Sequence, residues 1–240
     1  MSSLWSSDPA DAAKGDGKHA ETHLGDILAA LEKTYGSPRH GNKDDPLDEI
    51  IYIKLSQQTN DPKFRAMYQA LAERCPSWSG LENATQEELG EILRPGGLQY
   101  RRARDLRRMA AQICEDRGRL DLSWLDGLPT REAIEYLLSL YGVGIKTAYC
   151  VAMYSLGRQI LPVDIHVQRI SERLGLLPPG LSDKKRHQIM NGLIPPGHRY
   201  SFHVNCVGHG RAVCRKVPRC KDCMISQYCA HFQAQQDESS

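Results

Sequence analysis

The stretch Leu140-Tyr141-Gly142-Val143-Gly144-Ile145-Lys146-Thr147-Ala148 joins two segments of helical periodicity through a turn with two glycines. Glycine allows positive φ angles and a close approach of the backbone, and the start of the second helix leaves amide N–H groups unpaired. Such a turn can hold a phosphate, although G-V-G alone fits a simple packing joint between helices equally well. The stretch predicts two helices with a candidate phosphate site at Gly142, Gly144 and Thr147.

The sequence on both sides of this turn has helical spacing. Apolar residues recur at three- and four-residue steps from Leu24 to Leu31, and Thr85 followed by Glu88 is a capping-box signature. Further helices are predicted over residues 47–58, 62–74, 86–93, 100–116, 131–140, 145–156, 164–174 and 183–192, with one more before the last cysteines. No period-two strand, hairpin dipeptide pair or internal repeat is found, so we expect an all-α fold.

Composition describes an ordinary globular chain. Its 240 residues are 40% hydrophobic and 25% charged, and no apolar run approaches the ~20 residues that span a bilayer. The first residues have neither a basic start nor an apolar stretch, so we expect a disordered tail over residues 1–20, no membrane association and a cytoplasmic, nucleoid-associated location. The formal net charge of +2 names no partner.

Lys146 and Asp164 are the candidate reactive residues. Lys146 is expected in the first turn of its helix, where the dipole disfavours a cation and so favours a neutral, nucleophilic amine. Eighteen residues later, Asp164 stands at an expected helix start, where its ordinary role is an N-cap. A catalytic carboxylate at that position can perform both roles.

Half of the eight cysteines crowd into the short stretch from Cys214 to Cys229. Without an export signal this crowding favours a metal site in a reducing compartment, and four thiolates suit either zinc or an iron–sulfur cluster. The other four, Cys75, Cys114, Cys150 and Cys206, are expected to be buried structural thiols.

LxGVGxKTA, followed by PVDxHxxRxxxRLG, resembles the endonuclease III branch of the helix-hairpin-helix DNA glycosylases. The resemblance runs from about residue 47 to residue 232. It implies two helical domains with the active-site cleft between them. They are a six-helix domain with the helix-hairpin-helix over residues 40–157 and an iron–sulfur domain from residues 21–39 plus 158–232, before a tail over 233–240.

The same resemblance implies roles for individual residues. Lys146 is the nucleophile and Asp164 the carboxylate that assists it, while Gln58 fills the gap left by a flipped nucleotide and Leu98 wedges into the duplex. Read without the resemblance, Gln58 is a polar cap and Leu98 a core residue. The basic residues expected to extend the DNA contact are Arg101, Arg102 and Arg211.

The cysteine pattern Cys214-x5-Cys220-x2-Cys223-x5-Cys229 resembles the family's [4Fe–4S] loop. Its first interval is x5 where the family has x6. This departure leaves Cys214 the least secure ligand and Cys206 an alternative. Interleaved basic residues suit a loop that contacts DNA phosphates, or they offset the charge of the cluster.

These implications describe a bifunctional DNA glycosylase and apurinic/apyrimidinic lyase that acts as a monomer on duplex DNA and removes oxidised pyrimidines. The phrases LDLSWL and EYLLS also resemble the DEMETER-type 5-methylcytosine glycosylases. Two alternatives stay open: a base-excision enzyme for methylcytosine, uracil or mismatches, and a non-catalytic iron–sulfur module that binds DNA.

Overall fold

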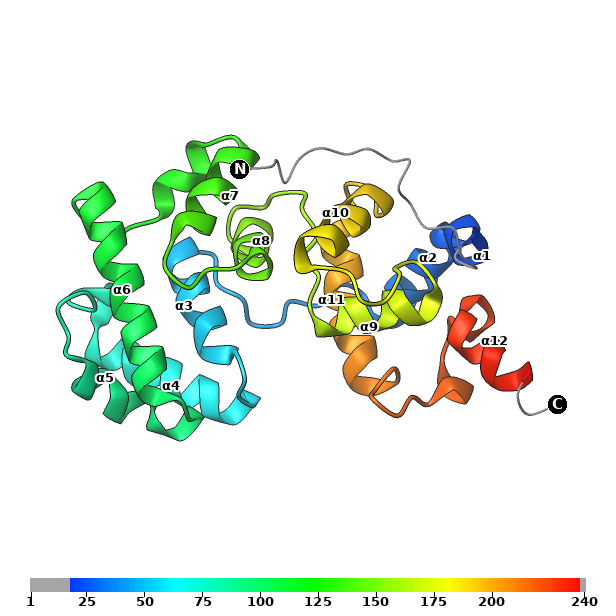
Figure 1. The fold of residues 1–240 in the computed structure, drawn as a ribbon, viewed down its shortest axis with the longest axis horizontal. Coiled ribbons are helices and arrows are strands. Elements are labelled where there is room, and N and C mark those ends of the chain that lie inside the picture. Colours follow the sequence, from blue (N-terminus) through cyan, green and yellow to red (C-terminus); the bar gives the residue numbers. More distant parts are fainter. Residues whose placement is uncertain (1–17, 238–240) are drawn as a thin grey trace. The chain divides into compact units, whose positions relative to one another are not determined.

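The computed structural model describes residues 18–237, and every regular element among them is a helix (Figure 1). The predicted all-α fold class is confirmed. By its internal contacts the chain divides into two compact units, residues 41–158 and residues 1–40 with 159–240. No helix among the described residues has both the length and the hydropathy needed to cross a bilayer.

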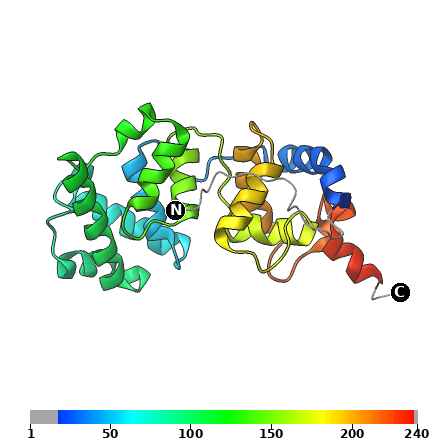
Figure 2. The same cartoon turned by 45° about the horizontal axis from the view of Figure 1, so that its top comes forward.

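The unit of residues 41–158 is built on a central helix, α3, which packs against α4, α6 and α8 (Figure 2). Its other close pairs are α5 with α6 and α7 with α8. The helices are α3 (Pro46–Ser56), α4 (Asp61–Arg74), α5 (Gln86–Leu93), α6 (Gln99–Arg117), α7 (Thr130–Ser139) and α8 (Ile145–Tyr154). Short 3-10 segments lie at Pro76–Trp78, Arg94–Gly96 and Ser123–Gly127.

Local sequence signals set the ends of these helices. The carboxylate of Asp45 accepts hydrogen bonds from the N–H groups of Leu47 and Asp48 and starts α3. Thr85 and Glu88 form the capping box predicted for α5. Caps of this kind satisfy N–H groups that a helix cannot pair internally, so they fix the first residue of each helix.

In the second unit, α11 packs against both α2 and α9. Its core consists of buried hydrophobic side chains from all three helices, with Phe202 and Cys206 contributed by α11. The helices are α1 (Lys18–Thr22), α2 (Leu24–Tyr35), α9 (Ile165–Leu174), α10 (Asp183–Leu193), α11 (Arg199–Ala212) and α12 (Ala230–Asp237). Two 3-10 segments, Cys220–Asp222 and Ser226–Tyr228, lie within the cysteine loop.

Both expected tails are shorter than the sequence suggested. Residues 18–20, placed in the disordered tail, begin α1, and residues 233–237, placed in the C-terminal tail, are the end of α12. The remaining parts of those two expectations, residues 1–17 and 238–240, lie outside the described residues.

Candidate functional site

The turn between α7 and α8 exposes both of its glycines. Gly142 has a φ of +70°, and the Val143 N–H donates to Leu140 O at 3.1 Å. Gly144 precedes α8 and no side chain caps the helix there. The first N–H groups of α8 can therefore serve an anion such as a phosphate, which a helix N-terminus favours.

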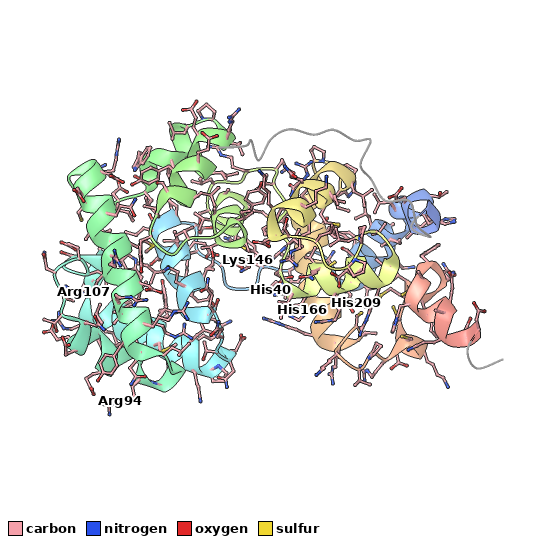
Figure 3. The ribbon with its side chains drawn as sticks, in the orientation of Figure 1. His40, Arg94, Arg107, Lys146, His166 and His209 are labelled. Carbon is pink, nitrogen blue, oxygen red and sulfur yellow. The ribbon has the colours of Figure 1, made fainter. Side chains whose placement is uncertain are left out.

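Lys146 is the second residue of α8, and its side chain is partly exposed (Figure 3). Its neighbour Thr147 is buried, and Thr147 Oγ1 accepts a hydrogen bond from Gln57 Nε2 at 3.3 Å. The sequence predicted that Thr147 contacts DNA. Its buried side chain instead links α8 to the end of α3. Lys146 is the one charged residue among the partly exposed side chains at this turn.

Two charged residues of α3 that the sequence analysis did not single out lie buried near this turn. Lys54 Nζ donates to Gly142 O at 3.0 Å, and burial lowers the pKa of this lysine. Glu49 is fully buried and accepts hydrogen bonds from Asn42 Nδ2 at 2.6 Å and from the Lys43 N–H at 2.7 Å. The sequence could have indicated these two buried charges, because both residues interrupt the apolar run LDEIIYIKL.

The structure brings Gln58 and Leu98 together as lining residues of one pocket, which Arg101 also lines. Both side chains are exposed, and both residues have positive φ angles, +52° and +53°. Residues other than glycine rarely adopt this conformation, and they do so mainly where the surrounding structure requires it. The two strained loops present a polar and an apolar side chain at one surface.

Arg102 holds these two loops in place. Its guanidinium is buried and donates to Gly97 O, Lys54 O, Leu55 O and Gln57 O. The expected phosphate contact at Arg102 therefore needs correction, because its donors serve the backbone of the pocket. Arg101, the next residue, has its side chain 67% exposed, and its Nε lies 3.9 Å from a carboxylate oxygen of Asp105.

Asp164 lies in the other unit and caps α9. Its Oδ1 accepts hydrogen bonds from the His166 N–H at 2.9 Å and the Val167 N–H at 2.8 Å. Asp164 therefore has the ordinary N-cap role, and the two hydrogen bonds hold its carboxylate in one orientation. The carboxylate is partly exposed.

The segment before Asp164 is anchored by three polar side chains, of which His187 and His203 are buried. Asn191 pairs with both backbone groups of Leu161, and His187 Nε2 accepts from the Val163 N–H at 3.0 Å. His203 Nδ1 lies 2.9 Å from Pro162 O. These contacts position the residues that lead into Asp164. All three side chains lie outside the sequence motif around Asp164, so the motif does not predict them.

The four clustered cysteines, Cys214, Cys220, Cys223 and Cys229, line one pocket. Arg173 donates to Cys214 Sγ at 3.1 Å, and His209 Nε2 lies 3.5 Å from Cys223 Sγ. Nitrogen donors beside sulfur suit thiolate ligands. Cys206, the alternative that the sequence offered, is buried in the core and does not line this pocket.

As the side chains stand, no group of three or more His, Cys, Asp or Glu residues within residues 18–237 is arranged to hold a metal ion. The chemistry of the donor set fits a cluster all the same, because four thiols line one pocket and two of them have a nitrogen of Arg173 or His209 beside the sulfur. All eight cysteines are free thiols.

The surface around the cysteine loop is basic. Arg211, in the last turn of α11, is exposed, as are the loop residues Arg215, Lys216 and Lys221. Arg219 is also exposed, but its Nε lies 3.7 Å from a carboxylate oxygen of Asp222. The expected DNA contact at Arg211 therefore lies on a surface with further positive charge.

Sequence comparison places these features in a family. Residues 52–196 match the HhH-GPD superfamily of base excision DNA repair proteins. The endonuclease III of Synechocystis sp. is 30% identical over 213 residues, which cover 87% of this chain and 92% of that protein. The chain therefore belongs to the HhH-GPD superfamily, and the resemblance to its endonuclease III branch is confirmed.

Plant relatives support the finer resemblance. A putative DNA glycosylase of Arabidopsis thaliana is 32% identical over 167 residues, and DNA glycosylase/AP lyase ROS1 of the same organism is 30% identical over 173 residues. These matches cover 69% and 65% of this chain, but only 56% and 12% of the two plant proteins. The chain thus corresponds to one part of the plant proteins.

Solved structures show the same fold. An endonuclease III in a non-covalent complex with DNA superposes with a TM-score of 0.75 at 24% identity, over 90% of this chain and 98% of that one. A thermostable thymine-DNA glycosylase superposes with a TM-score of 0.72 at 17% identity, over 91% and 100%.

Proposed function

We propose that this chain is a DNA glycosylase with apurinic/apyrimidinic lyase activity, in which Lys146 is the nucleophile. The observation that carries the proposal is the placement of Lys146. It is a partly exposed lysine in the first turn of α8, directly after a glycine turn at a helix N-terminus that no side chain caps, and such a terminus favours a phosphate. A lysine at this place can receive a nucleotide whose backbone the turn holds.

The pocket of Gln58 and Leu98 supplies the step that precedes chemistry. A base within a duplex must be extruded before an enzyme can reach it, and unstacking costs a few kcal/mol. Leu98, which is 51% exposed, is the wedge, and Gln58 occupies the vacated position. The positive φ angles of both residues hold these side chains ready before DNA binds.

In the chemical step, Lys146 Nζ forms a bond to C1′ of the sugar while the bond to the base breaks and the base leaves with the electron pair and takes up a proton. The Asp164 carboxylate, fixed by its two backbone hydrogen bonds, stabilises the positive charge that develops at the sugar. The nitrogen lone pair then forms the C1′=N bond of the Schiff base while the C1′–O4′ bond breaks, so the sugar ring opens and O4′ takes up a proton. Removal of a C2′ proton then breaks the C3′–O bond by β-elimination.

Cys214, Cys220, Cys223 and Cys229 are the residues that we propose hold a [4Fe–4S] cluster. Such a cluster, when bound, supplies cross-links that order the loop. The loop then presents Arg211, Arg215 and Lys216 to the phosphates of duplex DNA, which the protein binds as a monomer.

We infer that oxidised pyrimidines are the substrates, in keeping with the endonuclease III relative. The matches to ROS1 and to DEMETER of Arabidopsis thaliana favour 5-methylcytosine as the second candidate. Base release from duplexes that contain thymine glycol, 5-methylcytosine, uracil or a mismatch separates these cases. Release of thymine glycol with strand cleavage is the expected result. Release of another base alone would reassign the specificity, and no release from any duplex would support a binding-only module.

A further inference from the structure

Lys54 is a buried lysine near the end of α3 that the proposed chemical step does not use. It is 8% exposed, and its Nζ donates to Gly142 O at 3.0 Å. Burial of an ammonium group is costly because water no longer solvates the charge, so a buried lysine needs a polar partner. The partner here is the backbone of the glycine turn, 88 residues away in the sequence. Lys54 therefore holds this turn against α3.

A second side chain holds the same turn from α6. Gln112 Oε1 accepts a hydrogen bond from the Tyr141 N–H at 2.9 Å, and Gln112 Nε2 donates to Ser139 O at 3.1 Å. One helical turn earlier on α6, the guanidinium carbon of Arg108 lies 4.1 Å from the centre of the Tyr141 ring. The start of the turn is thus held through its backbone and through an aromatic side chain.

The two helices that hold the glycine turn also carry the residues proposed to extrude the nucleotide. α3 ends two residues before Gln58, and Leu98 directly precedes α6. Arg102 joins these two helix ends, because its guanidinium donates to carbonyls at the end of α3 and in the loop before α6. Lys54 itself lines the pocket of Gln58 and Leu98. The candidate phosphate site and the extrusion residues therefore belong to one hydrogen-bonded framework.

This framework matters because DNA sets the spacing between a phosphate and the neighbouring bases. A protein that holds the backbone at one place and inserts side chains at another must keep the two places in register, and a shift of about 1 Å can cost a large part of the rate. The turn at Gly142 has no helical hydrogen bonds of its own to fix its position relative to α3 and α6. Its position depends on the side chains that reach it.

We propose that Lys54 and Gln112 are positioning residues for nucleotide extrusion, which set the distance between a phosphate bound at the glycine turn and the side chains of Gln58 and Leu98. The inference rests on the proposed function, in particular on the roles of that turn and of those two side chains. It assigns to α3 and α6 the transfer of phosphate binding into insertion.

The test measures insertion into DNA without any chemical step. A duplex carries a tetrahydrofuran analogue of an abasic site, which has no base to release and forms no Schiff base, with 2-aminopurine beside it. Insertion of Leu98 and Gln58 unstacks the 2-aminopurine and raises its fluorescence, which stopped-flow mixing follows at saturating protein. Affinity for an undamaged duplex is measured in parallel, because phosphate contacts dominate nonspecific binding.

The variants Lys54→Met and Gln112→Met remove the two anchors and keep an unbranched side chain. We expect each to lower the rate of insertion by about tenfold, because the turn and the extrusion residues lose their register. Affinity for undamaged DNA should stay within about threefold, since the start of α8 and the exposed basic residues remain. Gln112→Met leaves the net charge unchanged, so it separates an effect of position from an effect of charge.

The controls make the same chemical changes at exposed positions, Lys33→Met on α2 and Gln69→Met on α4. Both should leave the rate of insertion and the affinity as they are in the parent. Leu98→Gly should lose most of the fluorescence change, because the signal reports the inserted side chain.

An unchanged rate of insertion in either folded variant would overturn the inference. An equal fall in rate and in affinity would also overturn it, because it would mean that the two residues only support the fold. If Lys54→Met does not fold, Gln112→Met alone decides. A parent protein that gives no fluorescence change would refute the inference together with the role of Leu98. Since this duplex forms no Schiff base, a failure of the lyase function is separate and appears only as absence of borohydride trapping.

Discussion

Arg101 and Arg102 are neighbours in the sequence but have opposite surroundings. Arg102 stands four residues before Leu106 and seven before Met109, so it lies on the buried stripe of α6, whereas Arg101 points to solvent. Their positive charge alone predicts a phosphate contact for both arginines. The helical spacing from Leu106 and Met109 separates them, because it puts only Arg102 on the buried face of the helix.

The two arginines therefore form a matched pair for mutation. Arg102→Ala leaves four backbone carbonyls without their donor, of which those of Lys54 and Leu55 are buried, and we expect the free energy of unfolding to fall by about 3 kcal/mol. Arg101→Ala should change it by less than about 0.5 kcal/mol, while it lowers the slope of log affinity for DNA against log salt by about 1. Urea denaturation and binding titrations at several salt concentrations check both. Equal loss of stability in the two variants would contradict this assignment.

Leu98 adopts a conformation that glycine accepts without strain. Leu98→Gly should keep or raise the free energy of unfolding, by up to about 1 kcal/mol, because the exposed side chain buries little. It should also slow base release from damaged duplexes, since the wedge is removed. Thermal unfolding and single-turnover base release measure the two effects. A destabilised variant with normal base release would refute the role of Leu98.

Glu49 makes stability depend on pH with a defined sign. Its pKa is 4.5 when unfolded and about 7 when folded, so the folded state binds more protons between these values. The free energy of unfolding therefore falls as the pH rises through this window, by up to about 3 kcal/mol from this residue. Urea denaturation at pH 5 and pH 8 should show a smaller fall in Glu49→Gln than in the parent. Parallel losses in the two proteins would contradict the burial of the charge.

At the scale of helices, apolar periodicity and capping residues predict where most of the helices lie. The predicted helix over residues 86–93 matches α5 because its capping box is local in the sequence. The predicted helix over residues 145–156 ends at Tyr154, and helices α1 and α12 were not predicted. Short terminal helices have little periodicity of their own and depend on tertiary contacts, as α12 does on α9.

The contact between α9 and α11 depends on a glycine. A Cβ at Gly210 would overlap the His166 ring and lie 3.0 Å from an Arg169 nitrogen. Arg169 also donates to Gly210 O at 3.1 Å and to Cys214 O at 2.9 Å, so the same contact fixes the start of the cysteine loop. No sequence rule identifies Gly210, because its neighbours come from a helix more than thirty residues away.

We expect Gly210→Ala to lower the free energy of unfolding by about 2 kcal/mol. Gly192→Ala in α10 is the control, since its Cβ would meet nothing within 4 Å. In that case alanine should raise the free energy of unfolding by about 0.5–1 kcal/mol, because a helical glycine loses more entropy on folding. Urea denaturation of both variants measures the difference. A neutral Gly210→Ala would show that the two helices can separate at little cost.

For the molecule as a whole, the motifs single out the proposed reactive residues but not the residues that support them. Lys146, Asp164 and the four cysteines stand out in the sequence because each belongs to a local pattern. Glu49, Lys54 and the buried side chains that anchor residues 161–163 act through contacts distant in sequence, so only the structure shows them. Base specificity depends on several loops, and the sequence left it open for the same reason.

The central claim is that Lys146 forms the covalent intermediate. The most direct measurement is borohydride trapping on an abasic duplex, followed by proteolysis and mass spectrometry to locate the modified residue. We predict one DNA adduct, on the peptide that contains Lys146, and its loss in Lys146→Ala with the fold intact. An adduct on another residue, or an equal yield in Lys146→Ala, would contradict the account.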